Sequence, residues 1–218
     1  MDKLYFLKER TKFIWYFYET ASQPFRQTIE KIETSEYPFE PPYSEDGEPP
    51  FMEEWHEASI ALAILGRTCV SMLSGSLKLY FKTLAVAIGI PCEKTCKKVF
   101  KDEGFVRGYR ACFGEALKLK WDECPADFAI LEQIALARNS DQHTGSITTL
   151  HATHSQKDHK QYPQLIFIND TDKDLFLVSD ANHCFFMNPT LHVSRETLFT
   201  AIEEVELLAK WLEKQTPG

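Results

Sequence analysis

The sequence predicts a mainly α-helical protein: an antiparallel helical bundle with a long central helix and a small β-hairpin appendage near residues 164–187. Apolar residues recur every three or four positions over several long stretches, as on one face of a helix. Clusters of proline, glycine and asparagine punctuate these stretches. Two short strand-like runs lie in the last third of the chain, and the 218 residues, 44% of them hydrophobic, can bury a sizeable core.

Three regions of one globular unit are expected. Residues 1–37 form an aromatic-rich helical segment in which Phe6, Phe13, Phe17 and Thr20 recur at helical spacing and Pro24 is expected to break or kink the helix. Residues 38–50, PFEPPYSEDGEPP, form a proline-rich arm, because proline restricts itself and its predecessor to extended conformations. Residues 51–218 form the bundle with its β appendage.

The central helix is expected over residues 51–88, where apolar residues occupy more than one face, so that the helix packs on several sides. At 1.5 Å per residue it would be roughly 50 Å long. Such a length suggests an antiparallel bundle that pairs with a second subunit. Ser74-Gly75-Ser76 in its middle could bend it or admit another helix closely.

Shorter helices are expected over residues 92–100, 104–121 and about 125–144. Residues 164–168 and 175–178 are predicted strands joined by the turn-rich Asn169-Asp170-Thr171-Asp172, and residues 184–187 could add a third. Ser194 is the expected N-cap of a final helix. The apolar stripe of that helix is Leu198, Ile202, Val205, Ala209 and Leu212.

Charge and composition favour some classes of protein over others. The net charge of −8 argues against a general nucleic-acid coat protein, although a local basic site is compatible with it. Scattered charges in MDKLYFLKERTKF are unlike a secretory signal. The best membrane candidate, Ala58–Leu65, is too short to cross a bilayer. A cytoplasmic protein is therefore expected.

Six cysteines are expected to be reduced thiols, with an extracellular disulfide set as the alternative. Cys92 and Cys96 lack a second spaced pair of ligands, so two thiols at helical spacing are favoured over zinc.

The stretch ILEQIALARNSDQHTGS, residues 130–146, carries the main functional signal. Asn139 and His143 are four residues apart and would be neighbours on a helix. Arg138 is displaced from His143 by about 140° on an ideal helix. Both can reach one substrate only if the helix loosens after Arg138 or if a second chain completes the site. By spacing alone, a polar helix end is the simpler interpretation.

Arg138, Asn139 and His143, in the pattern R-N-x-x-x-H at the end of an amphipathic helix, resemble the signature of the HEPN superfamily of nucleotide-binding helical domains. The resemblance covers about residues 52–145 and the last helix. It implies a metal-independent endoribonuclease without cofactors, acting as a homodimer with a composite site at the subunit interface. It also implies a toxin of a toxin–antitoxin pair or an effector of phage defence, with RNA as substrate and an antitoxin or other protein as partner.

The chemistry suits these residue types. A histidine with a pKa near neutrality can act as base or acid when a 2′-hydroxyl attacks phosphorus. Arginine offers a permanently charged fork for phosphate oxygens. Asn139 would orient His143 or hold the phosphate, and the product would be a 2′,3′-cyclic phosphate. The rival hypothesis is a HEPN-like module that binds a nucleotide or a partner protein without cutting RNA.

Other candidates have simpler alternatives. Contacts with RNA phosphates could come from a basic group, for which a solvated helix face is the equal alternative: Lys97, Lys98, Lys101, Arg107, Arg110 and, from a loop, His151. His151, His154 and His159 with Asp158 could hold zinc or nickel, but their spacing fits no standard ligand set, so no metal site is predicted. Glu132 could tune His143, although a surface glutamate is favoured.

Overall fold

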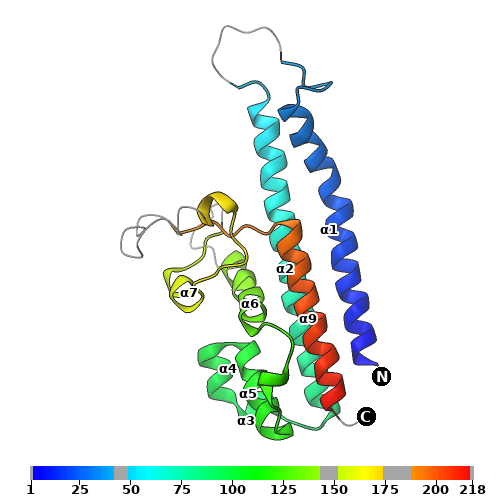
Figure 1. The fold of residues 1–218 in the computed structure, drawn as a ribbon, viewed down its shortest axis with the longest axis vertical. Helices are drawn as coiled ribbons and strands as arrows, with labels where there is room; N and C mark the ends of the chain where they lie inside the picture. The colour runs from blue at the N-terminus through cyan, green and yellow to red at the C-terminus, as the bar shows by residue number, and fades with distance from the viewer. Residues whose placement is uncertain (1, 42–48, 143–151, 174–187, 217–218) are drawn as a thin grey trace.

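The computed structural model describes residues 2–41, 49–142, 152–173 and 188–216, and these residues are mainly helical. Two long antiparallel helices dominate the shape: α1 (Lys3–Glu33) and α2 (Met52–Ala87). The C-terminal helix α9 (Arg195–Gln215) runs parallel to α2 and packs against both (Figure 1). The mainly helical class and the long central helix predicted from the sequence are confirmed.

Smaller helices lie beside the lower half of α2, on the side away from α1 (Figure 1). They are α3 (Cys92–Thr95), α4 (Lys97–Glu103), α5 (Phe105–Leu117), the 3₁₀ turn η1 (Trp121–Glu123) and α6 (Phe128–Gln142). A short α7 (Gln156–Gln161) follows, in the segment that leads away from α6. Of these, α6 packs most extensively on α2, so it belongs to the main core.

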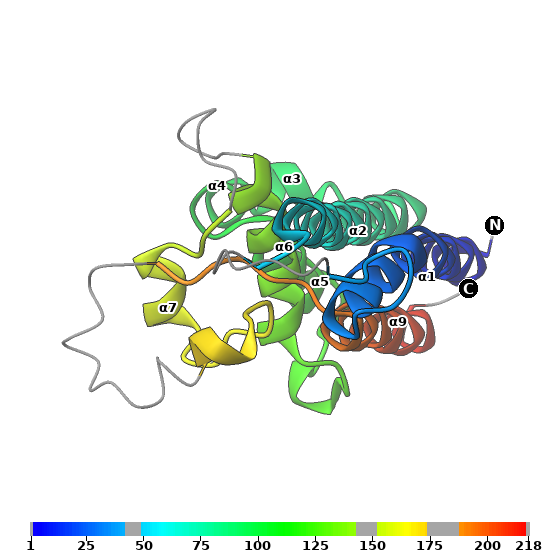
Figure 2. The same ribbon diagram turned by 90° about the horizontal axis from the view of Figure 1, so that it is seen from above.

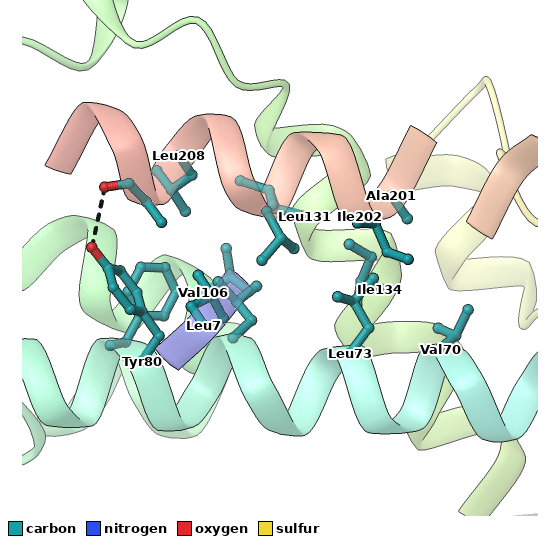
Figure 3. Packing of buried hydrophobic residues seen from close by; sticks show 14 of the residues in the cluster. Leu7, Val70, Leu73, Tyr80, Val106, Leu131, Ile134, Ala201, Ile202 and Leu208 are labelled. Carbon is teal, nitrogen blue, oxygen red and sulfur yellow. Dashed lines mark hydrogen bonds between the residues drawn. The ribbon is translucent and has the colours of Figure 1, made fainter. Parts of the chain in front are cut away.

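The core lies where α1, α6 and α9 meet α2. Leu73, Leu131 and Leu208 are fully buried there (Figure 3), and so is Leu198. The Tyr80 hydroxyl reaches across from α2 to the Ala209 carbonyl at 3.2 Å. Every member of the apolar stripe predicted for the last helix is buried, and the Ser194 hydroxyl caps it by accepting from the Thr197 amide at 3.2 Å. That prediction is confirmed.

The first helix differs from the expectation. α1 continues through Pro24 as one helix. Its buried side is Leu7, Thr11, Ile14, Tyr18 and Ser22. Of the aromatic residues singled out from the sequence, Phe6 and Phe13 are more than half exposed, whereas Phe17 is half-buried and packs against the core. Aromatic residues at helical spacing therefore do not by themselves identify the buried face of α1.

The predicted β-hairpin is not formed by the described residues. Residues 164–168 are bends and coil, and residues 175–178 and 184–187 lie outside the described part of the chain. An isolated antiparallel bridge joins Thr153 to Thr190. The strand prediction for 164–168 is wrong because this stretch satisfies its polar groups differently: the Gln133 side chain accepts from the Ile166 amide at 2.9 Å and donates to the Gln164 carbonyl at 3.2 Å.

Gly66 explains how the C-terminal segment reaches the core. A Cβ at this position of α2 would lie 2.7 Å from the Val193 carbonyl oxygen, so only glycine allows the chain before α9 to pass so close. At Gly75, two and a half turns further along, a Cβ would have no neighbour within 4 Å. Ser74-Gly75-Ser76 does not interrupt α2.

α2 is, among the described residues, the one helix long and apolar enough to cross a membrane by length and composition. Half of its most apolar window is buried inside the protein, and a core helix of a bundle has this same property. The sequence expectation that no run reaches this length is therefore wrong, because it considered only the stretch 58–65.

Candidate functional site

Arg138 and Asn139 lie near the C-terminal end of α6. The start of α6 is fixed by Asp127, whose side chain accepts from the Ala129 amide at 2.7 Å and whose own amide donates to Glu204 of α9 at 2.7 Å. Leu131 and Ile134 are fully buried in the core. The end of α6 is therefore held on a rigid support.

The two motif residues point in different directions. Arg138 is four residues after Ile134 and seven after Leu131, so it shares their face toward α2, and it is half-buried. Asn139 is rotated by about 100° from Arg138 and is exposed. The helix does not loosen after Arg138; it continues to Gln142. His143 lies outside the described residues.

The predicted phosphate-binding cations divide into two groups. Lys97, Lys98 and Lys101 are exposed on α4, where solvent and a ligand can reach them. Arg107 and Arg110 are half-buried and already contact neighbouring side chains. The Arg110 guanidinium lies 4.1 Å from the centre of the Phe128 ring and 5.9 Å from that of Trp121. His151 lies outside the described residues.

Arg107 belongs to a polar cluster beneath α6. Its guanidinium pairs with the Glu132 carboxylate at 2.8 Å and with Glu103 at 3.3 Å. The Tyr162 hydroxyl donates to the same Glu132 oxygen, and Gln161 donates to that hydroxyl at 2.7 Å. The hydrogen bond to Glu132 raises the pKa of Arg107. Burial is the larger cause, and the hydrogen bond to Glu132 the next, of the raised pKa of Tyr162. Arg107 and Tyr162 thus keep their protons around neutral pH.

Glu132 is therefore buried rather than a surface residue, with 8% of its area exposed. The sequence expectation was wrong because Tyr162, thirty residues away, closes over it. Nothing in the spacing around Glu132 predicts that partner. The cluster ties α6, α5 and the chain after α7 together, and its charges are satisfied by one another.

Of the three histidines considered as metal ligands, the side chain of His154 is described, whereas His151 and the side chain of His159 lie outside the described part of the chain. His154 is buried, and its Nε2 lies 2.7 Å from the Phe167 carbonyl oxygen. Asp158 accepts from the Ser155 amide and hydroxyl at 2.9 and 2.7 Å, in the capping box of α7. In the described ranges no three His, Cys, Asp or Glu side chains form a group that could hold a metal ion.

The cysteines include one pair that the sequence did not reveal. Cys92 of α3 and Cys112 of α5 form a disulfide, with Cα atoms 5.5 Å apart, so the expectation of a reduced thiol is wrong for these two. Cys69, Cys96 and Cys124 are free. Burial raises the pKa of Cys69 to about 12, so this thiol is no nucleophile at neutral pH.

Comparisons with protein families, with curated proteins and with solved structures each found no match to this chain.

Proposed function

We propose that this chain is a metal-independent endoribonuclease of the HEPN type, with a HEPN-like helical bundle and Arg138, Asn139 and His143 as its catalytic residues. The observation that carries the proposal is the position of Arg138. It lies in the last turns of a helix whose start is fixed to α9 and whose buried face packs on α2. A catalytic cation needs such a rigid support, because a small displacement from phosphate is costly for the rate.

The reaction needs no metal. His143 removes the proton of the 2′-hydroxyl, the oxygen attacks the adjacent phosphorus, and the bond to the 5′-oxygen breaks. A histidine, from the same or the other subunit, protonates the leaving oxygen. Arg138 stabilises the extra negative charge on the phosphate oxygens. The products are a 2′,3′-cyclic phosphate and a free 5′-hydroxyl.

A composite site in a homodimer accounts for the direction of the motif residues. One continuous helix points Arg138 and Asn139 about 100° apart. A second copy supplies the catalytic groups that one helix cannot direct at the same phosphate. The biological roles that go with this activity are a toxin held by an antitoxin or an effector of phage defence, working in the cytoplasm.

Phosphate contacts beyond the motif are assigned to Lys97, Lys98 and Lys101. These three are exposed on α4, whereas Arg107 is neutralised by Glu132 and Arg110 is stacked on Phe128. Each exposed lysine contributes to a salt-dependent affinity. Of the basic residues expected to bind phosphate, the proposal therefore keeps only the three lysines.

The test is cleavage of labelled RNA by the purified chain in the presence of EDTA, with the product ends determined by mass spectrometry. His143→Ala is expected to slow cleavage by about 10²–10⁴-fold. Arg138→Ala is expected to slow it by about 10²–10³-fold. His56→Ala, which removes an exposed histidine of α2, is the matched control and leaves the rate unchanged.

Cleavage by His143→Ala at the wild-type rate would refute the assignment. A wild-type chain that cuts no RNA but binds a nucleotide or a partner protein would support the rival, a non-catalytic HEPN-like module. Loss of activity on adding EDTA would refute the metal-independent mechanism.

A further inference from the structure

The outer face of α2 is exposed, and its middle carries no charge. Between Glu57 and Lys78 the only charged residue is Arg67, which is buried with 7% of its area exposed. Ile64, Thr68 and Gly75 are exposed along this stretch, and at 1.5 Å per residue it is about 30 Å long. In Figure 2, α2 lies at the edge of the bundle, with α1, α9 and α6 on its other sides.

The outer face of α9 has the composition that is usual for a solvent-exposed helix. Its exposed positions are charged or polar: Glu196, Glu203, Lys210, Lys214 and Gln215. A solvent-facing helix of a bundle normally has such residues. The uncharged middle of α2 therefore departs from what solvent contact favours.

The uncharged face continues into a groove between α2 and α1. Phe6 and Phe13 of α1 line it together with Met72, Gly75 and Leu79 of α2, and the α1 side of the groove also carries the charged residues Lys3, Glu9 and Arg10. The two helices together offer a surface about 30 Å long and about 20 Å wide, because packed helices lie about 10 Å apart. Its area, about 600 Å², approaches the roughly 800 Å² per partner of a standard interface.

Charges bracket this face with opposite signs at its two ends. Glu53 and Glu57 are exposed before it, and Lys78 and Lys82 are exposed after it. The Lys78 ammonium lies 5.8 Å from the centre of the Phe105 ring. These charges also complement the dipole of α2. The dipole does not account for the uncharged turns between them.

We propose that two copies of this chain dimerise through the outer faces of their α2 helices, packed antiparallel. The register that sets Glu57 opposite Lys78 of the other copy also sets Glu53 opposite Lys82. In the same register Ile60 faces Gly75, where a Cβ would meet nothing, and Ile64 faces Ser71. Large residues thus meet small ones, and opposite charges meet at both ends.

This arrangement rests on the proposed function and extends it, because it places the motifs of the two copies relative to the two-fold axis. The two-fold axis passes between positions 67 and 68. Figure 3 shows Ile134 of α6 over the turn of α2 that holds Leu73, and α6 runs antiparallel to α2. One turn beyond Ile134 is Arg138, and one turn before Leu73 is Cys69, so Arg138 is nearly level with the axis. An axis normal to the plane of the two α2 helices keeps both α6 helices on one side.

The first experiment measures molar mass in solution by light scattering. The wild-type chain, of 25.2 kDa, is expected at twice that mass. Thr68→Glu buries a charge at the axis and is expected to give monomers. Thr200→Glu of α9 is the matched control, because both hydroxyls bond the carbonyl one turn earlier, at 2.8 and 3.0 Å, and it leaves the dimer intact.

The second experiment tests the register by exchanging charges. Glu57→Lys and Lys78→Glu each bring like charges together and are expected to weaken the dimer. The double variant restores opposite charges and is expected to regain the dimer. Residues 57 and 78 are about 30 Å apart on one helix, so they cannot restore contact within one chain.

A monomeric wild-type chain overturns the proposal, and so does a dimer that Thr68→Glu leaves intact. A wild-type monomer that binds phospholipid vesicles would identify lipid as the occupant of the face instead. The outcomes separate this inference from the ribonuclease activity. A dimer that cuts no RNA refutes only the activity, and a monomer that cuts RNA refutes the dimer and its composite site while the activity stands. Circular dichroism confirms that each variant is folded.

Discussion

The helices α1, α2 and α9 and the segment 152–173 are attached to the core by different contacts. The three helices meet through aliphatic and aromatic side chains, with Leu73, Leu77 and Leu208 fully buried. The segment 152–173 buries Phe167 and packs Tyr162, Leu165 and Ile168 against Leu136, and it also makes side-chain hydrogen bonds. Gln133 bonds its backbone, Glu132 accepts from Tyr162, and within the segment His154 meets the Phe167 carbonyl. Apolar packing builds the first part, whereas in the second part side-chain hydrogen bonds to α6 add to the apolar packing.

This difference predicts which substitutions each part tolerates. Apolar burial has no direction, so α2 accepts neighbours on several sides. A hydrogen bond to a backbone group demands one atom in one place, and a lost partner leaves a buried polar group unsatisfied. Changes in the two parts should therefore differ in size and in how far they spread.

The largest effect is expected from Leu73→Ala in α2. Leu73 has no exposed area, so the change creates a cavity among α2, α6 and α9 and should lower the free energy of unfolding by about 2–5 kcal/mol. Urea denaturation followed by circular dichroism measures it. Val86→Ala, at an exposed position of the same helix, is the control. A loss of less than 1 kcal/mol for Leu73→Ala would mean that this core is loosely packed.

Gly66→Ala tests the contact between α2 and the chain that leads into α9. The new Cβ would lie 2.7 Å from the Val193 carbonyl oxygen, so the chain before α9 must shift, and a loss of about 1–3 kcal/mol is expected. Gly75→Ala of the same helix has open space and should gain up to about 1 kcal/mol from helix propensity. Both changes are made in the Thr68→Glu background, so that self-association does not enter the comparison.

Gln133→Leu should act locally. It removes the acceptor of the Ile166 amide and a donor to the Gln164 carbonyl, at a cost of about 1–3 kcal/mol. Hydrogen exchange should become faster at residues 164–168 while α9 keeps its protection. Gln164→Ala is the control, because only the carbonyl of Gln164 is used. Equal loosening of α9 would show that the two parts unfold as one.

The smallest effect is expected from the titration of His192. Burial lowers the pKa of His192 below its ordinary value of 6.5. The unfolded chain therefore binds more protons between the lowered pKa and 6.5, and stability due to this residue is full above 6.5 and falls as the pH decreases through that window. His192→Gln should flatten the slope of stability against pH. An unchanged slope would contradict the assignment.

The predictability of the fold follows the same division. The sequence predicted the apolar stripe from Leu198 to Leu212 and the N-cap at Ser194, because burial on one helix face repeats every three to four residues. The course of residues 164–168 was not readable, because their apolar run resembles a strand while Gln133 takes up the backbone groups. Pro24 was misleading for another reason: it is exposed, and α1 continues through it as one helix to Glu33.

For the candidate site, the sequence by itself determined the motif Arg138-Asn139 with His143 and the helix that carries its first two residues. Only the tertiary structure decided that Arg107 and Arg110 serve internal contacts, that Glu132 is buried, and that α2 leaves an uncharged face to solvent. The physical reason is distance along the chain. Periodicity reports which side of a helix is buried, whereas the partner that buries it lies thirty or more residues away and has no local signal.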